Sequence, residues 1–172
     1  MSDVTLEVVE RLAPLAMNEQ VRLSVGELPE LPVLGDRQYL VQMLTNLVEN
    51  ALKYTSGEDK RVRIEAGSHS STNGMQAWVG VIDNGPGISP EHLPHLFDRF
   101  YQVDKARTHQ NVDDKAEDDR MLSGVGLGLS IALWIAQAHG GEINVQSEIG
   151  TGSTFQVSLP LVASISASSQ PV

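Results

Sequence analysis

Two asparagines and a lysine recur at helical spacing in the segment NLVENALKYT, residues 46–55. Asn46, Asn50 and Lys53 stand at i, i+4 and i+7, so they fall on one face of an α-helix. Amide oxygens suit a hard cation such as Mg²⁺, which proteins hold through few side chains and complete with phosphate and water. The lysine can then meet a phosphate. The alternative is the solvated face of an amphipathic helix, and this segment alone does not separate the two.

A carboxylate ends a later apolar stretch. Asp83 follows WVGVI and opens DNGPGI, residues 83–88, whose glycines allow positive φ and a close approach to a ligand. The carboxylate can accept a hydrogen bond from an exocyclic amine. Such a charged hydrogen bond in a buried pocket contributes about 1.5–3 kcal/mol, enough to select adenine over a base with a carbonyl at that position. A surface turn of Asp, Asn, Gly and Pro is the alternative interpretation.

A glycine-rich run, GVGLGLS at residues 124–130, opens a predicted helix over residues 128–139. The N-terminus of that helix offers unpaired N–H groups and the positive end of the helix dipole to a phosphate. The run lacks the Lys-Ser/Thr pair of a Walker loop, and no apolar strand directly precedes it as a dinucleotide-binding turn requires. A simple hinge is the alternative. Because the helix is apolar nearly all round, we expect it to be buried.

The elements that must position these residues alternate between helices and strands. Helices are predicted over residues 4–17, 36–55 and 128–139, with Asp36 as the N-cap of the second. Strands are predicted over residues 21–26, 61–67, 76–83, 142–147 and 153–159, with a polar hairpin loop at 68–74, helical turns at 91–100 and a loop at 108–123. The second helix carries a stripe that we expect to be buried: Leu40, Met43, Leu44, Leu47, Val48 and Ala51.

Composition narrows the class of partner. The 172 residues fit a single core, and a formal net charge of −10 argues against nucleic acid or an anionic membrane as the main partner. The absence of cysteine excludes disulfides and thiolate metal sites. We expect a first-helix or linker region at residues 1–20, a catalytic domain at 21–162 and a disordered tail at 163–172.

Taken in order, five segments resemble the ATP-binding catalytic domain of sensor histidine kinases, in the superfamily that also contains gyrase, the heat-shock chaperone and MutL. Residues 46–55 match the N box, 83–87 the first glycine box, 96–101 (LFDRFY) the F box, 124–128 the second glycine box and 150–155 the following Gly-Thr-Gly-Ser-Thr segment. The resemblance implies a Bergerat-type α/β two-layer sandwich, with helices on one face of a mixed β-sheet. ATP would bind beneath a lid between the F box and the second glycine box.

The resemblance also implies roles for single residues. Asn50 would bind Mg²⁺, and Asp83 would bind the adenine amine, with Gly87 and Thr154 helping through water. The catalytic residues would be Asn46 at the phosphate end, Lys53 on a phosphate and Arg99 of the F box on the γ-phosphate. The residues expected to contact the nucleotide are Asn46, Asn50, Lys53, Tyr54, Asp83, Gly85, Gly87, Ile88, Gly124, Val125, Gly126, Leu127, Gly128 and Thr154.

Position 46 separates kinases from hydrolytic relatives. The gyrase-like and chaperone-like families place a water-activating glutamate four residues before the metal-binding asparagine, whereas Asn46 cannot act as a base. Glu49 does not replace it, because it points roughly 100° away from Asn50 around the helix. None of the five histidines is followed by the acidic residue of a phosphoacceptor motif. The acidic segment at residues 111–120 reads as a solvated insertion in the lid.

The sequence therefore predicts an enzyme domain of a sensor histidine kinase that transfers the γ-phosphate of Mg-ATP to a histidine on a separate dimerisation and phosphoacceptor hairpin. ATP and Mg²⁺ are the expected cofactors, and ADP, the hairpin and a downstream response regulator the expected partners. We expect no nucleic acid, no membrane contact by this segment and a cytoplasmic location, including as part of a membrane-bound receptor. The alternatives are a serine kinase of the anti-sigma type and a non-catalytic ATP-binding module.

Overall fold

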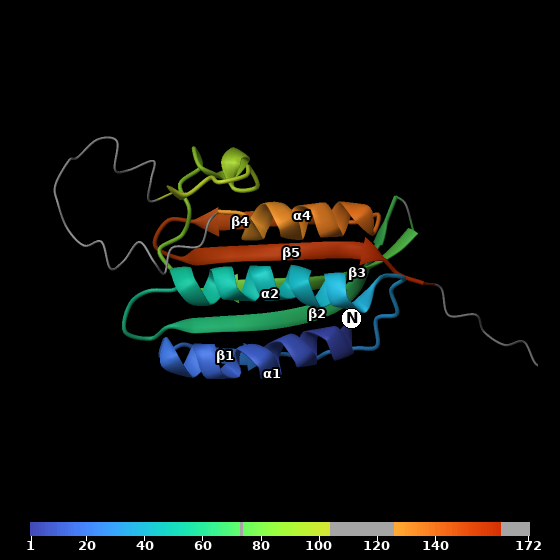
Figure 1. Cartoon of the computed structure of the whole chain (residues 1–172), viewed down its shortest axis with the longest axis horizontal. Helices are drawn as coiled ribbons and strands as arrows, with labels where there is room; N and C mark the ends of the chain where they lie inside the picture. The colour runs from blue at the N-terminus through green and yellow to red at the C-terminus, as the bar shows by residue number, and fades with distance from the viewer. Residues whose placement is uncertain (73, 104–125, 163–172) are drawn as a thin grey trace, which may run out of the picture.

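The computed structural model describes residues 1–72, 74–103 and 126–162. Figure 1 shows two layers, with helices α1, α2 and α4 lying over one face of a five-stranded sheet. The elements in chain order are α1 (Ser2–Asn18), β1 (Arg22–Val25), α2 (Arg37–Tyr54), β2 (Arg61–Ser71), β3 (Gly74–Asp83), the 3₁₀ turn η1 (Leu93–His95), α4 (Gly128–Ala138), β4 (Glu142–Glu148) and β5 (Gly152–Pro160).

The sheet is mixed, in the order β1-β2-β3-β5-β4. The β1–β2 pair is parallel, and the other three pairs are antiparallel. In this register Asp83, the last residue of the central strand β3, pairs with Val62 of β2 on one side and Ser153 of β5 on the other. The expected two-layer α/β sandwich is therefore confirmed, and Asp83 lies at the end of its middle strand.

Helix α2 begins as predicted. The Asp36 side chain accepts hydrogen bonds from the backbone N–H groups of Gln38 (2.8 Å) and Tyr39 (3.3 Å), which an uncapped helix would leave unpaired. All six residues of the predicted apolar stripe are buried in the common core. Because the apolar stripe packs on the sheet, the neighbouring polar face of α2 points toward the edge of the helix layer.

Helix α1 packs into the same core. Its residues Val4, Val8, Leu12 and Ala16 are buried together with the stripe of α2. The first-helix or linker region expected at residues 1–20 thus contributes one helix to the same core. The expected tail at residues 163–172 lies outside the described residues.

Two predictions about the elements are wrong. Strands β2 and β3 extend through most of the expected loop at residues 68–74, since Ser71 pairs with Gly74. Helix α4 is only partly buried: Ala132, Ile135 and Ala136 are enclosed, whereas Trp134 is 55% exposed. The α4 sequence has no charged residue on any face, so its composition did not reveal which side faces solvent.

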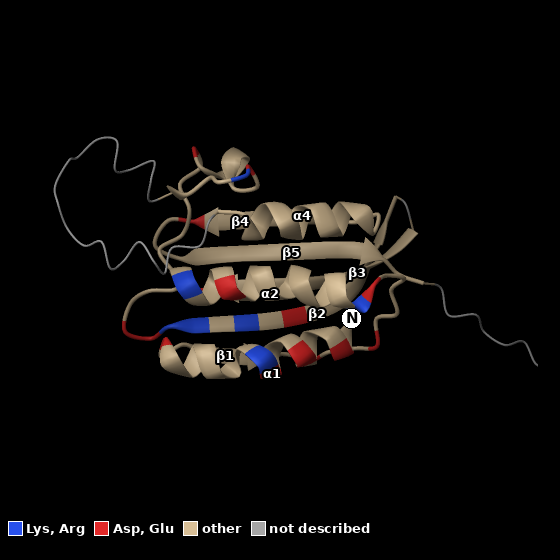
Figure 2. Ribbon diagram, in the orientation of Figure 1, with Lys and Arg blue, Asp and Glu red and all other residues tan. Residues whose placement is uncertain are grey.

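Charge is unevenly distributed over the fold. Figure 2 shows acidic and basic residues on α1 and β2, whereas α4 and β5 carry none. No helix in the described ranges is long and apolar enough to cross a bilayer.

Candidate functional site

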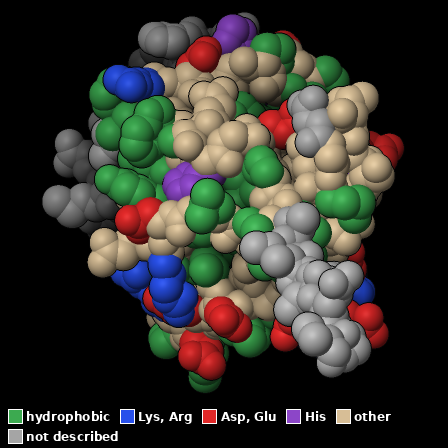
Figure 3. Space-filling view, turned by 90° about the vertical axis from the view of Figure 1, so that its right-hand side faces the viewer, with side chains coloured by type: hydrophobic (Ala, Val, Ile, Leu, Met, Phe, Trp, Pro, Cys, Tyr) green, Lys and Arg blue, Asp and Glu red, His purple; other side chains and the backbone are tan. Residues whose placement is uncertain are grey.

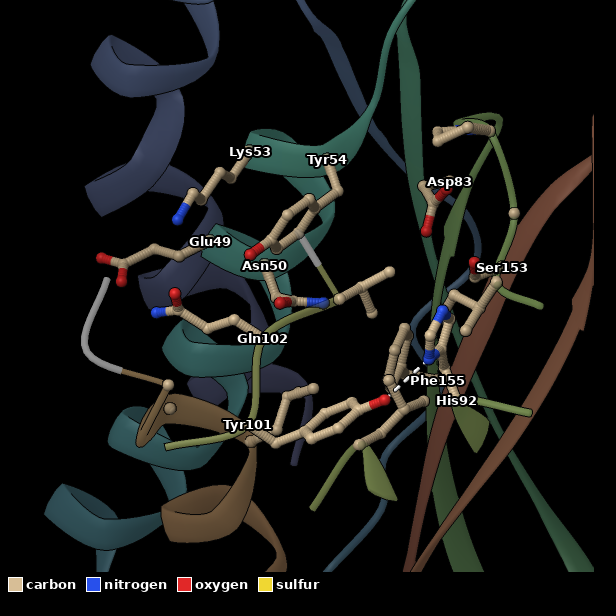
Figure 4. Close-up of a pocket in the computed structure, with 18 of the residues that line it drawn as sticks. Glu49, Asn50, Lys53, Tyr54, Asp83, His92, Tyr101, Gln102, Ser153 and Phe155 are labelled. Atoms are coloured by element: carbon tan, nitrogen blue, oxygen red, sulfur yellow. Dashed lines mark hydrogen bonds between the residues drawn. The ribbon is translucent and has the colours of Figure 1, made fainter. Parts of the chain in front are cut away.

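A cavity of about 1250 Å³ opens between α2, the start of α4, the F-box segment and the ends of β3 and β5. Figure 4 shows Asn50, Lys53 and Tyr54 on the α2 side and Asp83 and Ser153 on the opposite side. The sequence-predicted residues that line it are Asn46, Asn50, Lys53, Tyr54, Asp83, Gly87, Ile88, Gly126 and Gly128. Segments far apart in the sequence are thus brought to one cavity.

Asp83 is the buried charge of the cavity, with only 8% of its surface exposed. Burial raises the pKa of its carboxyl above the ordinary value, while hydrogen bonds from the backbone N–H groups of Gly85 and Ser153 act in the opposite direction. The Gly85 bond to Oδ1 is 2.9 Å long. These backbone donors fix the carboxylate at the end of β3, where it can accept a hydrogen bond from a ligand.

Gly87 allows the turn after Asp83 to pack against the β4–β5 hairpin. Its φ is +72°, and a Cβ there would lie 2.1 Å from the backbone oxygen of Glu148. A side chain at position 87 would therefore both strain its own backbone and collide with a backbone that cannot rotate away. The glycine lets two backbone segments form the wall next to Asp83.

The polar face of α2 forms the other wall. Asn46 and Asn50 are half-buried, and Lys53 and Tyr54 are exposed. The Lys53 Nζ lies 5.1 Å from the centroid of the Tyr54 ring, a cation–π contact that holds the ammonium group beside the cavity. Glu49 is exposed, as expected for a solvated charge, but it also lines the cavity, which we did not predict.

Asn46 connects this wall to the first turn of α4. Its Nδ2 donates a hydrogen bond of 3.1 Å to the backbone oxygen of Gly128, the first residue of that helix. Leu127 at the N-cap position makes no side-chain cap hydrogen bond, so within the described part of the chain the first N–H groups of α4 stay open to a ligand. Gly126, Gly128 and the side chain of Leu129 line the cavity at this point. The first turn of α4 thus presents to the cavity a helix N-terminus, a kind of site that favours anions.

The F-box segment closes the floor of the cavity. The Tyr101 hydroxyl lies 2.7 Å from Nδ1 of His92, and the Tyr101 ring stacks near His95 with centroids 5.5 Å apart. Figure 4 shows Tyr101 and His92 facing each other beside Phe155. This pair fixes the end of the F box against the cavity.

Several predicted residues lie elsewhere. The structure does not bring Arg99 to the cavity, because its side chain is exposed on the F-box turn, and neither Gly85 nor Leu127 is among the lining residues. Thr154 points to the face of β5 opposite Phe155, where it borders a shallow second cavity with Ile82. Gly124, Val125 and the acidic segment at residues 111–120 lie outside the described residues.

Ser153 is a lining residue that we did not predict. It pairs with Asp83 in the sheet and borders the cavity together with Phe155. The alternation of side chains along a strand was the signal that could have found it, because positions 153 and 155 share one face and position 154 the other. His92, Tyr101 and Gln102 also line the cavity; Tyr101 ends the F box, whereas no local pattern in the sequence marks His92 or Gln102.

Comparisons with known proteins agree with this arrangement. Residues 35–163 match the family described as histidine kinase-, DNA gyrase B- and HSP90-like ATPase. Sensor protein SrrB of Staphylococcus aureus (strain NCTC 8325 / PS 47) is 42% identical over 125 residues, which are 73% of this chain and 19% of the relative. The chain thus spans about a fifth of the length of the curated relatives that it matches.

Solved structures of histidine kinases share the fold. Full-length ShkA in complex with AMPPNP has a TM-score of 0.73 and 27% identity, over 93% of this chain and 30% of that one. The nucleotide-free catalytic domain of histidine kinase ThkA has a TM-score of 0.71 and 26% identity, over 94% of this chain and 92% of that one. With a family match over most of its length and these relatives, the chain belongs to the histidine kinase-, DNA gyrase B- and HSP90-like ATPase family, as an ATP-binding domain of the sensor histidine kinase type.

Proposed function

We propose that this domain binds Mg-ATP and presents the γ-phosphate to a histidine on a separate dimerisation and phosphoacceptor hairpin, from which a response regulator receives it. The observation that carries the proposal is the placement of a buried carboxylate, Asp83, across one cavity from the polar face of α2 and the open N-terminus of α4. The carboxylate suits the adenine amine, and the other two elements suit a polyphosphate.

At the base end, Asp83 would accept a hydrogen bond from the adenine amine, and the Ser153 hydroxyl would take the water-bridging role that we first expected for Thr154. Ile88 and Phe155 supply apolar surface for the ring. At the phosphate end, Lys53 and the first N–H groups of α4 would hold the negative charge. Arg99 would need to move from its exposed position to reach the γ-phosphate, so we assign it no contact here.

The donor set fits Mg²⁺ bound mainly by the nucleotide. In the described ranges, no group of three or more acidic or histidine side chains could hold a metal ion. Asn50 offers one amide oxygen at the phosphate end, which suits an ion that keeps several waters and binds substrate phosphates. When bound, Mg²⁺ would neutralise part of the phosphate charge. Asn50 would orient it.

Hydrolysis by the domain itself should be slow. Asn46 stands where hydrolytic relatives carry a glutamate, and its amide already donates to the Gly128 carbonyl, so it offers no base for water. Bound ATP would therefore remain intact until another part of the kinase supplies an acceptor. We propose a cytoplasmic location for the domain, which is compatible with a membrane anchor elsewhere in the kinase.

Phosphotransfer tests the proposal directly. The chain is incubated with γ-labelled Mg-ATP, alone and with the hairpin segment of the same kinase. We expect acid-labile label on the hairpin only, and little free phosphate. Label on a serine would indicate the anti-sigma type of kinase, nucleotide binding with no transfer would indicate a non-catalytic module, and rapid phosphate release by the chain alone would indicate an ATPase. Each of these three results contradicts the proposal.

A further inference from the structure

Helices α2 and α4 are tied together at both ends of their contact. At one end the Asn46 amide donates to the Gly128 oxygen, and at the other the backbone N–H of Asp36 donates to Nε2 of His139 over 3.2 Å. The N-cap of α2 thus meets the C-terminal end of α4, and the first residue of α4 meets the C-terminal half of α2, so the helices run antiparallel. Roughly 15 Å of helix separates the two hydrogen bonds along α2, at 1.5 Å per residue.

His139 uses both nitrogens of its ring. Its Nδ1 lies 2.7 Å from the backbone oxygen of Ile135, one turn earlier in α4, and must be the protonated nitrogen because a carbonyl only accepts. Nε2 is then the unprotonated acceptor for the N–H of Asp36. The imidazole therefore bridges the last turn of α4 and the N-cap residue of α2 as a neutral ring.

The absence of a side chain at Gly35 leaves space for this ring. A Cβ on Gly35 would lie 2.5 Å from Cδ2 and 2.9 Å from Nε2 of His139. Figure 3 shows the end of the molecule where α2 begins and α4 ends, where several hydrophobic side chains lie at the surface. Position 35 thus decides whether the imidazole can reach the backbone of Asp36.

The apolar contacts between the two helices do not by themselves fix the position of α4 along its own axis. The buried side chains of α4, Ala132, Ile135 and Ala136, are apolar, and Trp134 makes an edge-to-face contact with Tyr39 of α2 at 6.0 Å. Apolar contact is non-directional, so such an interface tolerates sliding. The two terminal hydrogen bonds are directional and hold the axial position.

We infer that His139 is a positioning residue for phosphate binding: it anchors the far end of α4 so that the first turn of this helix stays aligned with Asn50 and Lys53. The inference rests on the proposed function. A displacement of about 1 Å in a phosphate site is enough to reduce binding and transfer strongly, even when its cause lies far away. Asp83 and Ser153 belong to the sheet, so the adenine end does not depend on this anchor.

Substitution of His139 tests this separation. Titration calorimetry measures the affinity of the parent chain and of His139→Ala for Mg-ATP and for adenosine. We expect His139→Ala to weaken Mg-ATP binding about tenfold, as the loss of one well-placed hydrogen bond allows, and to change adenosine affinity less than about twofold. His139→Gln, whose amide can both donate and accept, should recover most of the loss.

Two further variants complete the test, one that displaces the imidazole and one that removes a histidine elsewhere. Gly35→Ala keeps the imidazole but displaces it, so it should weaken Mg-ATP binding in the same direction. His69→Ala removes an exposed histidine on β2 and should change neither affinity. Parent-level Mg-ATP affinity in His139→Ala and Gly35→Ala, or an equal loss for adenosine and Mg-ATP, would overturn the inference. A parent chain that binds adenosine and Mg-ATP at no measurable level would overturn the proposed function, and the inference with it.

Discussion

The Asp83 end of the cavity is formed by the ends of two hydrogen-bonded strands, whereas the Lys53 end is formed by side chains of two helices. Asp83 is buried and held by backbone N–H groups, and Gly87 packs backbone on backbone beside it. Lys53 and Tyr54 are exposed, and α4 is tied to α2 through hydrogen bonds near its ends. One end is fixed by sheet register, the other by how two helices lie together.

Under the proposed function, this difference separates base recognition from phosphate binding and transfer. A base needs one fixed acceptor, which the sheet supplies without moving. A polyphosphate and its metal need charges that can adjust to the ligand and to the incoming acceptor, which exposed side chains on a helix can do. Substitutions at the two ends should therefore fail in different ways.

The largest effect is expected at the Asp83 end of the cavity, which the sheet fixes. Gly87→Ala should lower the free energy of unfolding by at least about 3 kcal/mol, because the new Cβ meets the Glu148 backbone in addition to the cost of a positive φ. Gly150→Ala is the matched control: its φ is +81° and no atom lies within 4 Å of an added Cβ. It should lose only about 1–2 kcal/mol. Urea unfolding measures both, and equal losses would show that the collision is relieved at little cost.

The second-largest effect is expected on phosphotransfer, at the Lys53 end of the cavity. Asn50→Ala should lower the rate of transfer to a cognate hairpin about a hundredfold, because the variant loses the amide oxygen that we propose as a ligand for Mg²⁺. The melting temperature should stay unchanged, since Asn50 lies on the cavity face of α2 and not in the buried stripe. Asn18→Ala, at the exposed end of α1, serves as the control for an asparagine lost from a helix. Transfer at the parent rate would remove Asn50 from the metal site.

A smaller effect is expected on base recognition. Asp83→Asn should weaken adenine nucleotide binding about tenfold through the loss of one charged hydrogen bond. The preference for ATP over GTP should shrink as well, because an amide can also donate to the carbonyl of guanine. Calorimetry with both nucleotides checks this. If the parent chain binds GTP as well as ATP, Asp83 does not read the base.

The sequence was most informative where chemistry and local structure coincide. The Asp36 cap, the buried stripe of α2 and the cavity positions of Asn50, Lys53 and Asp83 all follow from spacing that one element determines. Residues that depend on the face of a strand were less accessible: Ser153 lines the cavity where Thr154 was expected, because the motif does not state which position points inward. The His92–Tyr101 pair spans 9 residues and the Asp36–His139 pair spans 103, and no local pattern predicts such pairs.

The last expected effect concerns the stability of the ligand-free fold, which the buried Asp83 carboxylate should lower. Burial raises the pKa of the Asp83 carboxyl above its ordinary value, so the folded state holds this proton more tightly than the unfolded state does. As pH rises from about 4 through the folded pKa, this carboxyl ionises and lowers the stability of the nucleotide-free fold. Asp83→Asn carries no charge, so its melting temperature should exceed that of the parent at pH 7, and the difference should shrink toward pH 4. Asp59→Asn, an exposed carboxylate in a surface ion pair with Arg61, should show no such trend. A lower melting temperature for Asp83→Asn at pH 7 would mean that the hydrogen bonds from Gly85 and Ser153 outweigh the cost of burial, and that this carboxylate stabilises the fold as well as the nucleotide.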